Sequence, residues 1–442
     1  MGQKHTFRKG GIHPPENKLA ASIVIEVLAV PPRVTIPLRL HIGAPAVALV
    51  AKGDAVKTGQ LIASGNDFIS ANVHSSVTGV VESISPLPDI SGIPTMMIVI
   101  KSEEDVWDTS VSNIETTPAN FNAATLVEKI KQAGIVGLGG ATFPSHVKLM
   151  VPRGKTVDTL IINGSECEPY LTSDHRLMLE NPHEMLKGVV VMMRALGLEK
   201  AFVGIEKNKA DAIDLLQNII QQEKISIEIV PLKVKYPQGA EKMLIYAITG
   251  RKVPSLALPV ETGCIVHNVG TALAVYDAVC KNKPLVERIL TVTQKTGVQK
   301  NYRVRIGTPV SYVLEKAGIA NDFKGKVIAG GPMMGKAIAS LETPVTKGMS
   351  GLLVLDEKDA FRPAVENCIR CARCVSACPM GLEPYILQQM VFAERYEETK
   401  SKFILDCMEC GSCQYICPSA RPLLDYIRKG KVKLNELLRK KS

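Results

Sequence analysis

Aromatic side chains are scarce in this chain of 442 residues, in which Phe, Tyr and Trp together make up 5% of the sequence. Proteins that bind single-stranded nucleic acid usually stack bases on aromatic side chains, so the net charge of +10 does not indicate a nucleic-acid partner. Long hydrophobic runs are missing too. The best ones, Ala21–Val30 and Val189–Met193, are much shorter than the ~20 apolar residues of a membrane-spanning helix. We therefore expect a protein without a membrane span.

No signal peptide precedes the basic segment at residues 1–9, and the sequence lacks a Ser-His-Asp or Cys-His set for nucleophilic catalysis. We therefore expect a protein of the reducing cytoplasm, without disulfides, whose chemistry depends on bound cofactors. Part of the positive charge lies in the tail at 428–442. This tail could lie on anionic lipid, dock on a partner subunit or form a solvated helix end.

Most of the cysteines form two copies of one motif near the end of the chain, C-x2-C-x2-C-x3-C-P. This is the spacing of bacterial two-cluster ferredoxins, in which the fourth cysteine of each motif ligates the other cluster. Structural zinc commonly uses separated C-x2-C pairs and needs no run of three such cysteines. The spacing therefore predicts two [4Fe-4S] clusters. The expected ligands are Cys368, Cys371, Cys374 and Cys417 for the first, and Cys407, Cys410, Cys413 and Cys378 for the second; Cys167, Cys264 and Cys280 are expected to be small hydrophobes.

Hydrophobic patterning predicts a multidomain α/β protein. Residues 1–22 are expected to form an N-terminal arm, and 23–105 alternate short β-branched runs with turns, which predicts a small β-sandwich or barrel. Its stretches Val50–Ile62 and Val73–Val81 resemble a lipoyl-type barrel-sandwich domain without the lipoylated turn. Between 106 and 285, strand-like runs alternate with helical periodicities, as in an α/β domain with a largely parallel sheet. The strand-rich segment 286–345 resembles a soluble-ligand-binding β-grasp module. The last segment, 346–442, is expected to be a helical ferredoxin-like domain with a basic tail.

Within these segments the patterns predict individual elements. The expected strands are Thr159–Asn163, Lys200–Glu206 and Ser226–Leu232, and the expected helices are Pro182–Leu196, Ala210–Glu223, Ala240–Ile248, Gly270–Cys280, Tyr385–Arg395 and Leu423–Leu438.

A glycine-rich segment runs from Gly137 to Lys148 and reads Gly-Leu-Gly-Gly-Ala-Thr-Phe-Pro-Ser-His-Val-Lys. Glycines allow backbone amides to approach a phosphate closely, and a following lysine supplies a positive charge for it. The segment lacks the Lys-Ser/Thr ending of a P-loop. It resembles the flavin loop of the NADH-binding flavoprotein subunit of respiratory complex I, where a Gly-x-Gly-Gly-x-x-Phe-Pro-x-x-x-Lys pattern recurs.

Three further blocks of that flavoprotein family follow in the same order. They begin at Asn163 (Asn-Gly-Ser-Glu-Cys-Glu-Pro, then Asp174), Tyr236 (Tyr-Pro-Gln-Gly-Ala-Glu) and Val266 (Val-His-Asn-Val-Gly-Thr). Ser165 stands where the family has Asp, and Gly270 where it has Glu. The resemblance implies non-covalent FMN with its phosphate near Gly137, Gly139, Gly140 and Lys148, further contacts from Asn163, Glu166, Asp174, Asn268 and Thr271, and Phe143, Glu168 and Glu241 on the side of NAD(H).

The arm carries a third distinctive stretch, Phe7-Arg-Lys-Gly-Gly-Ile-His-Pro-Pro-Glu-Asn-Lys18. With the other segments it resembles the C-subunit family of Rnf-type ion-translocating ferredoxin:NAD oxidoreductases. That resemblance implies a peripheral subunit on the cytoplasmic side of the inner membrane, held by the other subunits of the complex. It would exchange hydride between NAD(H) and FMN and pass single electrons through its clusters to or from a ferredoxin-like iron–sulfur subunit, because flavin connects two-electron and one-electron chemistry.

Two other interpretations stay open at this point. One is a cobalamin-reductase-type flavoprotein of bacterial microcompartments, which shares the flavin, β-grasp and cluster modules, although the position of the arm favours the Rnf type. The other is a cluster-bearing electron-transfer scaffold without flavin. The A subunit of Na+-translocating NADH:quinone reductase is related but lacks the cluster motifs, so the cysteines exclude it.

Overall fold

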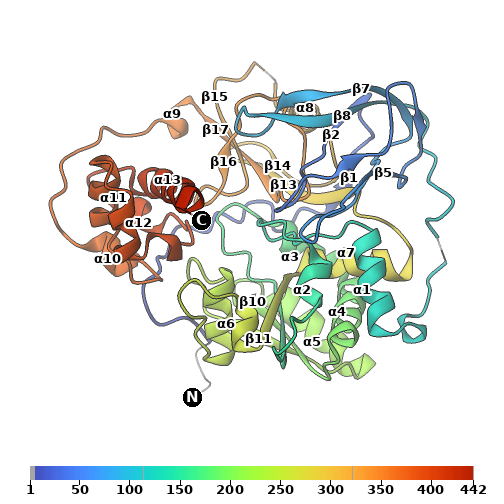
Figure 1. Cartoon of the computed structure of the whole chain (residues 1–442), viewed down its shortest axis with the longest axis horizontal. Helices are drawn as coiled ribbons and strands as arrows, with labels where there is room; N and C mark the ends of the chain where they lie inside the picture. Colours follow the sequence, from blue (N-terminus) through green and yellow to red (C-terminus); the bar gives the residue numbers. More distant parts are fainter. Residues whose placement is uncertain (1–4, 113, 321, 442) are drawn as a thin grey trace.

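The computed structural model describes residues 5–112, 114–320 and 322–441. The C-terminal helices form a lobe beside a larger body that holds all the sheets (Figure 1). None of the helices in the described ranges combines the length and the apolar character needed to cross a membrane.

Two antiparallel sheets form the N-terminal part of the larger body. The first sheet has the order β2-β8-β7-β4 and the second has the order β3-β5-β6. Their inward side chains, such as Val34, Ile62 and Ile98, are fully buried in a common core. The strands are β2 (Arg33–Pro37), β3 (Val47–Ala48), β4 (Ala55–Val56), β5 (Leu61–Ser64), β6 (Val73–His74), β7 (Gly79–Pro88) and β8 (Pro94–Ser102).

A four-stranded parallel sheet with the order β11-β10-β9-β12 forms the centre of the α/β part, as the alternation of strands and helices predicts. The helices α4, α5 and α7 cover one face of this sheet, and α6 covers the other. The strands are β9 (Thr159–Asn163), β10 (Ala201–Glu206), β11 (Ile227–Leu232) and β12 (Cys264–Asn268). The helices are α1 (Ala123–Gln132), α2 (Ser145–Leu149), α3 (Ser173–Glu180), α4 (Pro182–Leu196), α5 (Ala210–Glu223), α6 (Glu241–Thr249) and α7 (Val269–Cys280).

A mixed six-stranded sheet with the order β1-β14-β13-β17-β15-β16 completes the larger body. Two of its strands come from outside the segment 286–345: β1 (Ile25–Val27) pairs in parallel with β14, and β17 (Gly351–Asp356) pairs with β13 and β15. The segment predicted to form the barrel-sandwich therefore gives its first strand to this sheet. The other elements are β13 (Glu287–Gln294), β14 (Gln299–Arg305), α8 (Val310–Lys316), β15 (Gly325–Ala329) and β16 (Lys336–Ala337).

The C-terminal lobe is built from short helices around the cysteine motifs and one long final helix. Ile427 and Leu434 of α13 pack against Leu387 and Val391 of α11, so much of the basic tail belongs to a packed helix. The helices are α9 (Glu357–Ala360), α10 (Arg373–Ala377), α11 (Pro384–Phe392), α12 (Ser412–Tyr415) and α13 (Leu423–Lys441).

Candidate functional site

Two predicted flavin-contacting asparagines lie side by side at one end of the parallel sheet. Asn163 ends β9, Asn268 ends β12, and the two residues are paired in register. Nδ2 of Asn268 donates to Asn163 O at 3.3 Å and to Oδ2 of Asp174 at 2.6 Å. Open α/β sheets bind ligands outside the carboxyl ends of their strands, which is where this pair lies.

The glycine-rich loop lies against the same end of the sheet. The Leu138 amide donates to Oγ1 of the buried Thr271 at 2.9 Å, and the Gly137 amide donates to Phe143 O at 2.8 Å. A side chain at Gly139 would touch Asn268, whereas Gly140 has a φ of +111° and open space around it. In the described part of the chain, the amides of Gly139 and Gly140 donate to no protein acceptor. Exposed amides of this kind suit a phosphate group.

Lys148 extends from α2 towards the start of α6. Its ammonium donates to Oε1 of Glu241 at 2.8 Å and to Val266 O at 3.1 Å. The lysine and glutamate side chains are 28% and 38% exposed. An anionic ligand at the loop would therefore compete with the Glu241 carboxylate for this ammonium.

The acids of the Asn163 block serve mainly as helix and loop caps. The Glu166 carboxylate accepts from the amides of Asp174 at 2.8 Å and His175 at 3.2 Å, at the first turn of α3. Burial, followed by the nearby charge of Glu166, raises the pKa of Asp174 to about 6. Asp174 thus lies beside the Asn163–Asn268 pair, and the buried guanidinium of Arg288 lies near both carboxyl groups.

Glu168 faces a different part of the protein. Its carboxylate accepts from the amides of Met333 at 3.1 Å and Met334 at 2.7 Å, in the loop between β15 and β16. Burial raises the pKa of Glu168 to about 7, although these amides oppose the shift. Its partners therefore connect the flavin-type block to the loop at 330–335.

The two departures from the flavoprotein pattern have local structural consequences. Gly270 donates its amide to Oδ1 of Asn268 at 2.8 Å, which caps α7. A small cavity of about 40 Å³ lies behind Leu138 and is lined in part by Asp174, Gly270 and Arg288. Ser165 is fully buried, and its carbonyl accepts from the Lys209 ammonium at 2.7 Å. The glycine loop and the asparagine pair are both present despite these two substitutions.

The predicted ligands of the first cluster surround one cavity in the C-terminal lobe. We call these residues the first quartet: Cys368, Cys371, Cys374 and Cys417. The cavity measures about 410 Å³. Cys371 is exposed and Cys374 is buried, so this cavity opens to solvent on one side.

The predicted ligands of the second cluster also line a common cavity, which is narrower at about 20 Å³. This second quartet consists of Cys378, Cys407, Cys410 and Cys413. The amides of Leu382 and Glu409 donate to the sulfurs of Cys378 and Cys407 at 3.3 and 3.4 Å. Burial raises the pKa of Cys407 to about 12.

Each quartet takes three cysteines from one motif and the fourth from the other. Within residues 5–112, 114–320 and 322–441, no three His, Cys, Asp or Glu side chains gather tightly enough for a single metal ion. A [4Fe-4S] cube binds each thiolate at a different iron, so its ligands stand farther apart than those of one zinc ion. The cysteines that share each cavity are the two predicted ligand sets.

The two motifs share a backbone conformation as well as a cysteine spacing. The residue before the second cysteine has positive φ in both, at Arg370 (55°) and Glu409 (59°), and so does the residue after it, at Ala372 (58°) and Gly411 (76°). Non-glycine residues rarely adopt this conformation. Alternating right- and left-handed residues turn successive amides inward to form anion-binding nests, which occur at many iron–sulfur sites.

The second quartet lies against the larger body. The Tyr236 hydroxyl donates to Cys410 O at 2.7 Å, and a Cβ at Gly411 would lie 2.8 Å from Met333 O. From the basic tail, Lys431 donates to Cys407 O at 2.8 Å and, like Arg428, pairs with Glu409. These contacts were not predicted, because the spacing of Tyr236, Arg428 and Lys431 carries no ligand pattern.

Family models match three parts of the chain. They are described as RnfC barrel sandwich hybrid domain over residues 5–105, Nuo51 FMN-binding domain over 130–277, and 4Fe-4S dicluster domain over 363–418. The glycine loop, Asn163 and Asn268 fall in the FMN-binding match, and both quartets fall in the dicluster match. The predicted FMN and cluster cofactors agree with these families.

Full-length relatives identify the family. The C subunit of the proton-translocating ferredoxin:NAD(+) oxidoreductase complex of Clostridium ljungdahlii is 46% identical over 95% of this chain and 92% of its own length. The chain belongs to the Rnf C-subunit family. The Na(+)-translocating counterpart in Acetobacterium woodii is 42% identical over 98% of both chains, and the C subunit of the ion-translocating oxidoreductase complex of Rhodobacter capsulatus is 39% identical over 97% of this chain and 83% of its own.

Solved structures extend the similarity of fold beyond the Rnf family. The crystal structure of an NAD+-reducing [NiFe]-hydrogenase in its H2-reduced state matches with a TM-score of 0.50 and 19% identity, over 66% of this chain and 60% of the other. The air-oxidised state of such a hydrogenase gives the same TM-score at 18% identity, over 71% and 64% of the two chains. About two thirds of this chain therefore shares its fold with part of an enzyme that differs widely in sequence.

Proposed function

We propose that this member of the Rnf C-subunit family exchanges hydride between NAD(H) and FMN and passes single electrons through two [4Fe-4S] clusters. One observation carries the proposal: a loop with free amides, at the carboxyl end of a parallel sheet, lies in the same chain as two cysteine quartets. When bound, flavin supplies the step between two-electron and one-electron transfer. The protein supplies binding, orientation and electrostatics.

The proposed FMN site uses the free amides of Gly139 and Gly140, with Lys148 as the cation for the phosphate. The pair Asn163 and Asn268 offers amide groups at the sheet edge, and Thr271 fixes the loop through Leu138. Asp174 lies beside the pair with Arg288 nearby, and Lys148 supplies a positive charge at Val266 O. We propose that nicotinamide binds on the side of Phe143 and Glu241.

The proposed clusters take the first and second quartets as ligands. The second quartet contacts Tyr236 and the loop at 330–335 of the larger body, whereas the first has an exposed ligand, Cys371. This arrangement supports an order of carriers: flavin, second cluster, first cluster, external partner. The partner we propose is a ferredoxin-like iron–sulfur subunit, and exposed Ile369, Arg370 and Arg373 near Cys371 suit an acidic protein.

Relatives named as subunits of ion-translocating complexes support a place in such a complex. We propose that the chain is held peripherally on the cytoplasmic side of the inner membrane by the other subunits. Ion movement would then occur outside this chain. For the segment 286–345, with α8 packed on its strands, we retain the proposal of a β-grasp module.

An anaerobic titration of reconstituted protein with NADH tests the proposed function. We expect loss of the oxidised-flavin absorbance, followed by EPR signals of reduced clusters, with two electrons recovered per NADH. Protein whose clusters accept electrons from dithionite, but which binds no flavin or does not respond to NADH, would instead be an electron-transfer scaffold. The nucleotide chemistry would then belong to another subunit.

A further inference from the structure

The N-terminal arm has no role in the function proposed so far, although its sequence stretch Phe7–Lys18 is distinctive. In Figure 1 the arm runs beside the C-terminal helices before it enters the larger body. The Gly11 amide donates to Ala377 O at 2.9 Å, and Ile12 exchanges two backbone hydrogen bonds with Tyr236, both at 2.9 Å. The arm therefore touches both the cluster lobe and the α/β part.

At its cluster end the arm fits only because it has glycines. Gly10 has a φ of +66°, and a Cβ there would lie 2.5 Å from the carbonyl carbon and oxygen of Cys378. Gly11 has a φ of +86°, and its Cβ would lie 2.7 Å from the ring of Phe7 and 2.9 Å from Tyr236 O. The arm thus packs its backbone directly on the backbone of a proposed cluster ligand.

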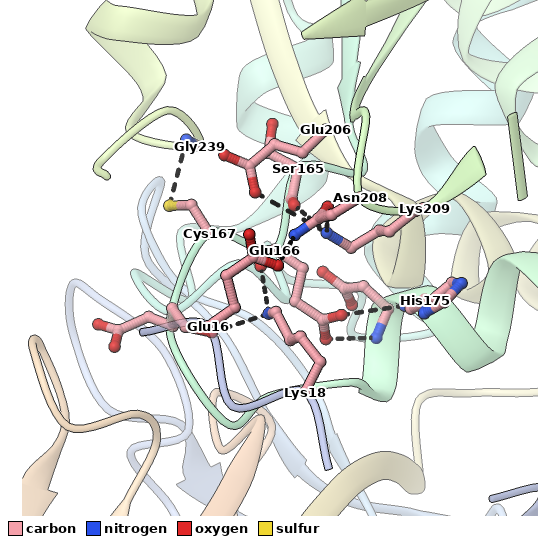
Figure 2. A network of polar contacts seen from close by, with 12 residues as sticks. Glu16, Lys18, Ser165, Glu166, Cys167, His175, Glu206, Asn208, Lys209 and Gly239 are labelled. Atoms are coloured by element: carbon pink, nitrogen blue, oxygen red, sulfur yellow. Dashed lines mark hydrogen bonds and ion pairs between the residues drawn. The ribbon is translucent and has the colours of Figure 1, made fainter. Parts of the chain in front are cut away.

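At its other end the arm places Lys18 inside the flavin-type block. The Lys18 ammonium donates to the carbonyls of Glu166 at 2.6 Å, Glu168 at 2.9 Å and Leu171 at 2.7 Å. These bonds use all three hydrogens of the ammonium. Figure 2 shows Lys18 directed at the Glu166 segment, next to Cys167 and Lys209.

The loop that Lys18 holds has an unfavourable backbone. Glu166 and Tyr170 have positive φ values of 44° and 68°, which cost free energy for residues with side chains. The loop persists because surrounding bonds fix it, and Lys18 supplies three of them. A second bond from the arm, from the Tyr170 amide to Glu16 O at 3.0 Å, lies beside them.

The same loop connects the two proposed redox regions. At one end the Glu166 carboxylate caps α3 beside the asparagine pair, and at the other the Glu168 carboxylate holds the amides of Met333 and Met334. Met333 in turn lies against Gly411, the residue after Cys410 of the second quartet. Fixing the loop therefore fixes the distance between the flavin site and the second cluster.

We infer that the arm Phe7–Lys18, with Lys18 as its positioning residue, sets the geometry for electron transfer between the flavin and the second cluster. This inference rests on the proposed function. Each NADH delivers two electrons as a hydride, and each cluster accepts one electron, so two successive single transfers must cross this contact. Their rate depends steeply on the distance between the carriers. In the described residues, no hydrogen bond joins the arm to Gly139, Gly140 or Lys148, where the phosphate of FMN is proposed to bind.

Stopped-flow absorbance of the full, reconstituted chain with NADH tests the inference. We expect Lys18→Met to leave flavin bleaching, FMN content and cluster EPR spectra unchanged, while cluster reduction slows roughly tenfold or more. Gly10→Ala disturbs the arm from its cluster end without touching the Lys18 bonds, so cluster reduction should slow while flavin bleaching and FMN content stay unchanged. Because its Cβ would press on the backbone of Cys378, the EPR signal of the second cluster should change in this variant. Arg8→Ala, an exposed position on the same arm, should behave as wild type.

The outcomes separate the inference from the proposed function. If wild-type protein does not bleach its flavin with NADH, the proposed function fails before the arm is tested. If wild-type protein shows both phases and loaded Lys18→Met and Gly10→Ala variants match it, the arm is only a stabilising segment and the inference is wrong. Loss of bound FMN in Lys18→Met together with normal cluster reduction in Gly10→Ala would also overturn it.

Discussion

Replacing Lys148 by alanine is the sharpest test of the proposed FMN site. The ammonium has two partners, Glu241 at 2.8 Å and Val266 O at 3.1 Å, and the side chain is 28% exposed. A charge-assisted hydrogen bond contributes about 1.5–3 kcal/mol when well buried, and partial exposure reduces this to about 1–2 kcal/mol. Since 1.4 kcal/mol corresponds to a factor of ten, we expect FMN to bind about 5- to 30-fold more weakly.

The pair with Glu241 allows a second, opposite prediction. Glu241→Gln removes the carboxylate that competes with the phosphate for Lys148, while it keeps the size of the side chain. An exposed ion pair contributes about 0–1 kcal/mol, so FMN should bind up to about fivefold more tightly. Lys148→Ala and Glu241→Gln should therefore shift the FMN affinity in opposite directions.

Fluorescence titration of FMN into flavin-free protein, at fixed ionic strength, measures these affinities. Lys155→Ala is a matched control, because Lys155 forms a similar exposed pair with Glu261 at 2.6 Å, with side chains 42% and 38% exposed. Its FMN affinity should equal that of the wild type. An unchanged affinity in both Lys148→Ala and Glu241→Gln would refute the placement of the phosphate at this lysine.

Three further predictions concern the quartets, the loop and pH. Cys378→Ser should abolish the EPR signal of the cluster held by Cys407, Cys410 and Cys413. Cys417→Ser should abolish the signal of the other cluster, and each variant should keep about half of the iron. Loss of the opposite cluster in either variant would contradict the ligand sets. Thr271→Val leaves the Leu138 amide without its acceptor at a cost of about 1–3 kcal/mol, so it should lower the melting temperature and flavin retention, whereas Thr271→Ser should restore both. Burial raises the pKa of Glu168 to about 7 in the folded protein, whereas its ordinary value is 4.5. Between these pH values the folded protein holds a proton that the unfolded chain has released. The contribution of Glu168 to stability therefore falls as pH rises from about 4.5 to 7. The melting temperature of Glu168→Gln should fall less than that of the wild type across this range, and parallel curves would contradict the assignment.

The elements with clear local signals could be predicted from the sequence. The predicted strand Thr159–Asn163 and the predicted helices Pro182–Leu196 and Ala210–Glu223 have the bounds of β9, α4 and α5. Proline at the first position and Gly197 after the last turn, with a φ of 67°, mark the ends of α4. The Rnf family assignment is likewise confirmed by the full-length relatives. It could be made from the sequence because the motifs that carry it are short and contiguous.

Contacts between distant segments could not be predicted in this way. The pairing of β1 with β14, and the three carbonyls bound by Lys18, join residues that no periodicity relates. Glu168 is a similar case: its resemblance to the flavoprotein block suggests a nucleotide contact, but its carboxylate faces the amides of Met333 and Met334. Local patterns fix elements and motifs, whereas the direction of a side chain depends on what the fold brings next to it.

The two cysteine motifs show the same limit for function. Their spacing is identical, so the sequence pattern assigns them equal roles, yet their surroundings differ. The first quartet includes the exposed Cys371, while the second is enclosed by Tyr236, Met333 and the basic side chains of α13. Cluster potentials depend on charge, hydrogen bonds to sulfur and exposure to solvent. We therefore expect two clusters with different potentials and different partners, one facing the flavin and one facing the outside, for electrons travelling in either direction.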